Sequence, residues 1–247
     1  MNLRDLLKSR GHKGLPLSTV RLFAQQLLYA FDLIHKYKII HADCNKYLNL
    51  VKPDNTIVNQ KSDRVRLCDF GSSLLEDEVV ITSELVSRFY RPPEIILGNS
   101  YDSKVDIWSL GCTLFEIFTG QIMFNGRSNN EMLKLMMQIR GPMPNKIVKK
   151  GQFSSMYFND NGDFLSLEIE PSIKKEYLKE IKMNNFPSKD LMSILKLYSS
   201  NEDSKSLATF KDFLEKCLHL DPKKRISALE GLTHEFIGII PVGTFGK

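Results

Sequence analysis

Cysteine is scarce in this chain and is not arranged for metal binding or for a disulfide framework. The four cysteines among 247 residues are Cys44, Cys68, Cys112 and Cys217, and they form no C-x-x-C pair. Zinc sites and small secreted disulfide scaffolds both need closely spaced cysteines, so the sequence indicates neither. We therefore expect reduced thiols, as in proteins of the cytosol or the nucleus.

Long apolar runs and a strong excess of one charge are also absent. No segment approaches the ~20 apolar residues of a membrane span, and the charged start MNLRDLLKSRGHKG lacks the apolar core of a signal peptide. The net charge is only +5, which does not require nucleic acid as a partner. With 42% hydrophobic and 26% charged residues, the composition is that of an ordinary globular protein with a sizeable core.

Helical periodicity is the main pattern that the chain does contain. Residues 17–37 place apolar side chains at three- and four-residue steps, which predicts a long amphipathic helix with Ser18 or Thr19 as its N-cap. Residues 102–120 are apolar nearly all round and predict a buried central helix that ends at Gly120. Further helices are expected over 128–141, 206–225 and 227–237.

Two other regions complete the predicted fold. Thr56–Asn59 and Arg64–Cys68 are short β-like runs around a turn-prone QKSD, which predicts a small hairpin. Residues 141–206 are polar, rich in lysine and interrupted by prolines, which predicts an irregular insert with a short helix near 188–198. The predicted fold class is therefore mainly α.

Several acidic and amide side chains suit phosphoryl transfer. That reaction needs metal ions held by carboxylate or amide oxygens and a group that orients the attacking hydroxyl. Asp69 lies in CDFG after a β-like run, Asp43 lies in HAD, and Lys52 and Asn55 lie in KPDN. A lone Asp before Phe-Gly is more often a turn, so the combination carries the signal.

The order of these blocks resembles the C-terminal lobe of a eukaryotic protein kinase. HAD, KPDN, CDFG, SRFYRPPEIILG, VDIWSLGC and LDPKKR follow one another as they do in that family. The resemblance covers nearly the whole chain and is most similar in detail to the DYRK-related pre-mRNA-splicing kinases of the CMGC group. It implies a kinase-like C-terminal lobe with small β-hairpins over 1–247, with a CMGC-type insert at 141–206.

This resemblance implies a role for each matching residue. Asp43 and Lys52 would be catalytic, Asn55 and Asp69 would hold Mg²⁺, and Asp54, Asn55, Ile57 and Asp69 would bind ATP, with Ile57 under the adenine ring. Core packing is an equal alternative for Ile57. The implied partners are protein substrates, namely splicing factors, in the nucleus or otherwise the cytoplasm, with no membrane and no direct nucleic-acid contact.

The resemblance also implies structural pairs. Glu94 and Arg225 match a buried ion pair, and Asp106 matches a carboxylate of the central helix that holds the catalytic-loop backbone. Glu84 stands where these kinases carry an activating tyrosine, near the end of an activation loop. There it is either a permanent negative charge that pairs with Arg88 or Arg91, or an exposed glutamate without a regulatory role.

Two departures from the family pattern predict that this polypeptide alone has little or no kinase activity. No glycine-rich phosphate loop and no V-A-I-K lysine precede MNLRDLLK, so we expect that the N-terminal lobe is missing. Eleven residues separate Asp43 from Asn55, which is seven more than the pattern H-R-D-x-x-x-x-N has. The extra stretch is NKYLNLV or CNKYLNL, and a translated non-coding segment would also explain it.

Two alternatives therefore stay open. The first is a pseudokinase or scaffold that binds partners without phosphotransfer, which Mg-ATP binding without turnover would favour. The second is a basic nucleic-acid-binding module, which rests on the net charge and on lysines such as Lys146, Lys149 and Lys150. That module predicts salt-dependent binding of RNA.

Overall fold

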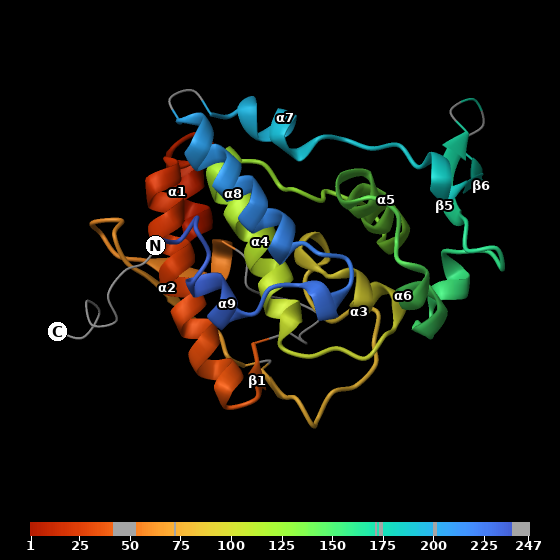
Figure 1. The fold of residues 1–247 in the computed structure, drawn as a ribbon, viewed down its shortest axis with the longest axis horizontal. Helices are drawn as coiled ribbons and strands as arrows, with labels where there is room; N and C mark the ends of the chain where they lie inside the picture. The colour runs from red at the N-terminus through yellow and green to blue at the C-terminus, as the bar shows by residue number, and fades with distance from the viewer. Residues whose placement is uncertain (42–52, 72, 171, 173–174, 200–201, 239–247) are drawn as a thin grey trace.

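Helices dominate the fold, and small two-stranded antiparallel sheets accompany them (Figure 1). The computed structural model describes residues 1–41, 53–71, 73–170, 172, 175–199 and 202–238. The helices are α1 (Leu3–Ser9), α2 (Leu17–Lys36), α3 (Pro93–Leu97), α4 (Lys104–Thr119), α5 (Asn129–Arg140), α6 (Asn145–Lys150), α7 (Leu191–Lys196), α8 (Ser204–Cys217) and α9 (Ala228–Leu232). The strands are β1 (Ile39–Ile40), β2 (Thr56–Val58), β3 (Val65–Leu67), β4 (Leu74–Leu75), β5 (Phe164–Glu170) and β6 (Lys175–Ile181).

Helix α4 forms the centre of the molecule, as its apolar sequence predicted. Every residue from Val105 to Thr119 is buried, and the helix packs against both α2 and α8 (Figure 1). It ends at Gly120, which has a φ of 76° and donates its N–H to the Glu116 carbonyl at 2.7 Å. A left-handed residue after the last turn suits glycine, so this predicted helix end is confirmed.

Helix α2 is long and amphipathic as predicted, but its predicted N-cap is wrong. The helix begins at Leu17 after Pro16, ahead of both Ser18 and Thr19, and no side chain of its own caps it. Instead, the Glu202 carboxylate accepts the Leu17 N–H at 2.8 Å. Because this cap comes from a residue 185 positions away, the local sequence pattern could not indicate it.

The predicted hairpin at 56–68 is confirmed, although its strands are shorter than the apolar runs. β2 pairs antiparallel with β3, so that Thr56 faces Leu67 and Val58 faces Val65. Asn59 still donates its N–H to the Arg64 carbonyl at 3.1 Å, and its side chain closes the turn by accepting the N–H groups of Asp63 and Arg64. A second pair, β1 with β4, joins segments that the sequence did not connect.

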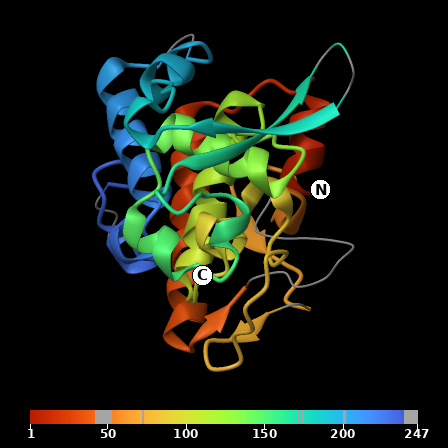
Figure 2. The same ribbon diagram turned by 90° about the vertical axis from the view of Figure 1, so that its right-hand side faces the viewer.

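The prediction of an irregular insert at 141–206 is wrong. The region contains α6, a β5–β6 hairpin with seven-residue strands, and α7, which lies within the predicted short helix. FLSLEIE alternates apolar and polar side chains, a strand pattern that the neighbouring prolines and lysines obscured. The hairpin extends from the right-hand end of the molecule in Figure 1 and crosses the facing side in Figure 2.

The described cysteines agree with the expectation of reduced thiols. Cys68, Cys112 and Cys217 are free, and Cys44 lies outside the described residues. Burial raises the pKa of both Cys112 and Cys217, which keeps these thiols protonated. Within the same residues, no helix combines the length and apolar character needed to cross a bilayer.

Candidate catalytic site

Asn55 and Asp69 lie at the same end of the β2–β3 pair. Asn55 closes a 3₁₀ turn, Pro53–Asn55, directly before β2, and Asp69 follows β3 by two residues. Cys68 donates its N–H to the Asn55 carbonyl at 3.0 Å, and its thiol approaches the same oxygen at 3.1 Å. The strand register thus places Asn55 opposite Cys68, and Asp69 is the next residue along the chain.

The environment of these two residues suits an oxygen-liganded cation. Asn55 is only 3% exposed, and its Nδ2 has no hydrogen-bond partner in the described part of the protein. Asp69 has a φ of 66°, a left-handed conformation that is uncommon outside glycine and that gathers at functional sites. The unpartnered Nδ2 is a donor, so a metal at Asn55 would be bound through Oδ1 instead. A carboxylate and an amide oxygen are donors that Mg²⁺ accepts.

His41 anchors the start of the predicted catalytic loop to this cluster. Its backbone N–H donates to Asp106 Oδ2 at 2.9 Å, and its Nε2 lies 3.1 Å from the Cys68 carbonyl. Because a carbonyl only accepts, Nε2 carries the hydrogen. The ring also packs edge-on against Phe70 with centroids 4.9 Å apart. The predicted role of Asp106 in holding this backbone is confirmed at His41, which is itself fully buried.

Ile57 lies on an exposed face next to the chain start. Its side chain is 47% exposed, so the core-packing alternative is wrong. An isolated antiparallel bridge joins Ile57 to Asn2, and the following residue, Val58, donates its N–H to the Met1 carbonyl at 2.8 Å. This exposed aliphatic side chain, two residues beyond Asn55, is available to contact a ligand, and its place under adenine stays a prediction.

Asp54 takes part in a charged network that the sequence did not reveal. Arg4 Nε lies 3.2 Å from Asp54 Oδ2, and Nη2 donates to the Tyr90 hydroxyl at 2.7 Å. Arg4 also pairs with Glu116, which accepts the Tyr90 hydroxyl at 2.5 Å. Burial opposes the charge of Arg4, but its acidic partners raise its pKa above the ordinary value. The network ties α1 to α4 beside the catalytic loop.

A signal for this network was present in the sequence. Glu116 is a lone acidic residue in the otherwise apolar second half of α4, and it is 1% exposed. Charged residues are almost never fully buried without a partner, so a cation is expected beside Glu116. Which residue supplies that cation depends on the packing of α1, which brings Arg4 to a residue 112 positions away.

Arg91 fixes the end of the predicted activation loop through backbone contacts. Its Nε donates to the Val86 carbonyl at 3.0 Å, and its Nη2 donates to the Glu84 carbonyl at 3.2 Å. Val86 has a φ of 75°, a strained conformation for a β-branched residue that these contacts help to hold. Burial lowers the pKa of Arg91 to about 10, and the Glu84 charge opposes that shift. Arg91 thus contacts the backbone of an exposed glutamate.

Glu94 and Arg225 form the predicted buried ion pair. Arg225 donates from Nη1 to Glu94 Oε1 at 2.6 Å and from Nη2 to Oε2 at 2.9 Å, and both side chains are 0% exposed. The guanidinium also lies over the Trp108 ring, 5.1 Å from its centroid, and donates to the Lys104 carbonyl. This prediction is confirmed, and the pair links α3 to α4 and to the segment after α8.

A comparison with known proteins assigns this arrangement to a family. Residues 1–237 match the protein kinase domain. The chain belongs to the protein kinase family. It is 41% identical over 239 residues to the serine/threonine-protein kinase prp4 of Schizosaccharomyces pombe, and 43% identical over 241 residues to prpf4B of Dictyostelium discoideum. It is also 34% identical over 238 residues to the human dual specificity tyrosine-phosphorylation-regulated kinase 4.

These relatives are longer than this kinase-family chain. Each alignment covers 96% of the chain, but only 48% of prp4, 29% of prpf4B and 41% of the human kinase. The chain therefore spans about half or less of the proteins that it matches. The resemblance to DYRK-related splicing kinases is confirmed at the level of family.

Asp43 and Lys52, the two predicted catalytic residues, lie outside the described residues. So does the seven-residue excess within 44–51. The described chain stops at His41 and resumes at Pro53, and both ends contact the cluster around Asn55 through the bonds given above. The roles of Asp43 and Lys52 stay predictions.

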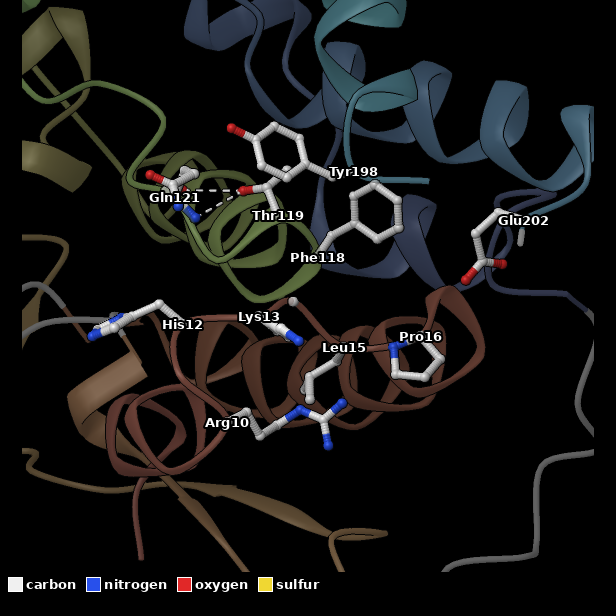
Figure 3. A pocket seen from close by; sticks show the side chains of 11 residues that line it. Arg10, His12, Lys13, Leu15, Pro16, Phe118, Thr119, Gln121, Tyr198 and Glu202 are labelled. Atoms are coloured by element: carbon white, nitrogen blue, oxygen red, sulfur yellow. Dashed lines mark hydrogen bonds between the residues drawn. The ribbon is translucent and has the colours of Figure 1, made fainter. Parts of the chain in front are cut away.

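A cavity of about 560 Å³ lies apart from the predicted kinase site (Figure 3). The loop from Arg10 to Pro16, the end of α4, Tyr198 and Glu202 line it, and none of the predicted site residues does. The loop that lines it is bound to α4, because Leu15 donates its N–H to the Ile117 carbonyl at 2.7 Å. This cavity therefore gives no support to the kinase assignment.

Proposed function

We propose that this chain is part of a serine/threonine protein kinase that transfers phosphate from Mg-ATP to protein hydroxyl groups. The observation that carries the proposal is that Asn55 and Asp69 flank the same end of the β2–β3 pair, where Cys68, the neighbour of Asp69, donates its N–H to the Asn55 carbonyl. In protein kinases the second Mg²⁺ is held by an asparagine of the catalytic loop and the first by the Asp of Asp-Phe-Gly. The chain offers both residue types at one strand end, next to the exposed Ile57.

Each site residue has a defined place in this proposal. Asp43 would orient the substrate hydroxyl and accept its proton, and Lys52 would offset charge on the transferred phosphate. Asn55 and Asp69 would hold the metal, which neutralises phosphate charge when bound. Ile57 would contact the base, while Asp54 would support the site through its pair with Arg4.

We further propose that residues 1–247 act as a kinase C-terminal lobe and that transfer needs parts that this sequence does not contain. Residues 1–247 include no glycine-rich phosphate loop and no V-A-I-K lysine. Both elements bind the phosphates from the opposite side, so this polypeptide alone would bind Mg-ATP weakly and turn it over negligibly. By resemblance to the splicing kinases, its substrates would be splicing factors in the nucleus.

The unusual catalytic-loop spacing favours a second candidate, a pseudokinase that binds partners or nucleotide without transfer. Displacing reacting groups by about an ångström costs about a hundredfold in rate, and seven extra residues lie between Asp43 and Asn55. A loop tolerates added length at little entropic cost, so both ends can keep their positions. Turnover measurements separate the two candidates.

Magnesium-dependent binding of a fluorescent ATP analogue to the full chain tests the proposed site. Asp69→Ala should abolish the magnesium-dependent part of the signal, while Asp77→Ala, an exposed aspartate in a nearby turn, should leave it unchanged. Radiolabelled phosphate transfer to protein substrates, after fusion to a kinase N-terminal lobe, then distinguishes kinase from pseudokinase. Equal binding by both variants would contradict the proposed metal site.

A further inference from the structure

The β5–β6 hairpin carries an exposed apolar face. Its register pairs Leu167 with Leu178 and Ile169 with Glu176, and cross-strand partners lie on the same face of a two-stranded sheet. Leu178 is 58% exposed, Ile169 is 55% exposed and Leu167 is 39% exposed. Together with Glu176 and Glu180 they form what we call the hairpin face. Three large aliphatic side chains thus gather on one side of a short sheet.

On the opposite side of the hairpin, the residues of β5 are already used for packing. Phe164 and Ser166 are fully buried, and Glu168 pairs with Lys134 of α5 at 2.5 Å. A two-stranded hairpin is marginally stable by itself, so this packing is what holds β5 and β6 in place. Because β5 packs against α5, the hairpin face is held in place while its side chains remain exposed to solvent.

One edge of the hairpin is covered, whereas no backbone bond to the outer edge of β6 is found among the described residues. Asn130 of α5 donates from Nδ2 to the Leu165 carbonyl at 2.6 Å and accepts the Leu167 N–H at 2.8 Å, which caps the outer edge of β5. Leu165 and Leu167 thus direct their backbone N–H and C=O groups away from β6. Their cross-strand partners, Glu180 and Leu178, therefore direct their own N–H and C=O groups away from β5, toward the outer edge of β6. Every side chain from Lys175 to Glu180 is exposed.

We propose that β6 binds an extended segment of a partner protein as a third strand. Backbone pairing along the open edge would give affinity, and side chains on the hairpin face would give selectivity. The face carries two carboxylates, Glu176 and Glu180, so it favours a strand with an aliphatic residue beside Leu178 and basic residues beside these two glutamates. Glu180 already contacts Lys182 at 2.6 Å, so Glu176 is the stronger attractor.

This inference does not depend on the proposed phosphotransfer. The hairpin belongs to the segment between α6 and α7, whereas Asn55 and Asp69 lie on the β2–β3 pair. Binding at β6 can therefore be present or absent whether or not the chain handles Mg-ATP. Its test uses the full chain without nucleotide.

A fluorescently labelled peptide tests the proposal by anisotropy. Its central residues read lysine, glutamate, isoleucine, threonine and lysine, which face residues 180 to 176 in an antiparallel register. We expect saturable binding that Leu178→Lys weakens about tenfold. Glu176→Lys should weaken it about threefold and reduce its salt dependence. Leu197→Lys, at a leucine that is 79% exposed outside the hairpin, is the matched control and should change nothing.

Two further measurements can contradict the proposal, namely the binding of an N-methylated peptide and the oligomeric state of the chain. N-methylation of the central isoleucine removes the N–H that would bond the Leu178 carbonyl, so this peptide should not bind. Equal binding by the two peptides, equal affinities of the Leu178→Lys and Leu197→Lys variants, or no binding at millimolar concentration would overturn strand addition. Self-association of the chain that Leu178→Lys abolishes would show instead that a second copy occupies the edge.

Discussion

Helix α4 and the β5–β6 hairpin use apolar residues for opposite purposes. From Val105 to Thr119 every side chain of α4 is buried among other elements, whereas β6 exposes every side chain from Lys175 to Glu180. The helix carries the stability of the molecule, because burial of apolar surface is the main favourable term in folding. The hairpin keeps aliphatic side chains in water at a cost, which agrees with the proposal that β6 binds a partner strand.

The largest effect is expected where a charge is buried beside α4. Glu94→Gln would leave the Arg225 guanidinium in a fully buried position without its counter-charge, so we expect a loss of about 3–5 kcal/mol in the free energy of unfolding. Urea denaturation measures it. The exposed Glu176→Gln on the hairpin is the matched control and should stay within about 0.5 kcal/mol. Comparable losses from the two variants would contradict the contrast between the regions.

Alanine substitution of two glycines with positive φ, one beside α4 and one beside the hairpin, should show a smaller difference in the free energy of unfolding. A Cβ at Gly120, after α4, would lie 1.9 Å from the His12 carbonyl oxygen, whereas a Cβ at Gly162, before β5, meets only Asn145 Oδ1 at 3.7 Å. Left-handed strain costs about 1–2 kcal/mol at either position, and the clash adds about 1–3 at Gly120. Gly120→Ala should thus lose about 3 kcal/mol and Gly162→Ala about 1, as thermal unfolding would show.

The same contrast explains what the sequence could predict. α4, its end at Gly120 and the β2–β3 hairpin depend on local patterns, and all three are confirmed. The β5–β6 hairpin was missed because its alternation is short and lies among prolines and lysines, and its packing on α5 is not visible locally. Local patterns therefore sufficed where an element is visible in its own residues, as a buried helix or as two β-like runs around a turn.

The candidate site divides in the same way between local and distant contacts. Asn55 and Asp69 were found through motifs on each side of one hairpin, which a strand register brings together. The Arg4 network and the Glu202 cap join residues 112 and 185 positions apart, so only the fold reveals them. A residue type indicates that a partner is needed, while packing decides which residue it is.

The helical region and the hairpin should lose stability at different pH values. Burial lowers the pKa of His234 after α9, whose Nδ1 accepts the Phe236 N–H at 3.1 Å while Nε2 faces Asp212 Oδ2 at 2.8 Å. Protonating Nδ1 would break the first bond, so the unfolded chain takes up this proton at a higher pH than the folded chain. Stability from neutral His234 is therefore lost as the pH falls through about 6.5.

The hairpin should respond only at lower pH. Hydrogen bonds from Lys182 and Lys134 lower the pKa of Asp163 and Glu168, so the stability that these carboxylates add is present above about pH 4 and is lost as the pH falls further. Hydrogen exchange measured across pH should show α8 and α9 losing protection first and the hairpin later. His234→Gln should remove the first step, whereas the exposed His12→Gln should keep it. Loss of hairpin protection near pH 6 in the unmodified chain would show that the hairpin depends on the helical region for its order, because its own carboxylates remain charged there.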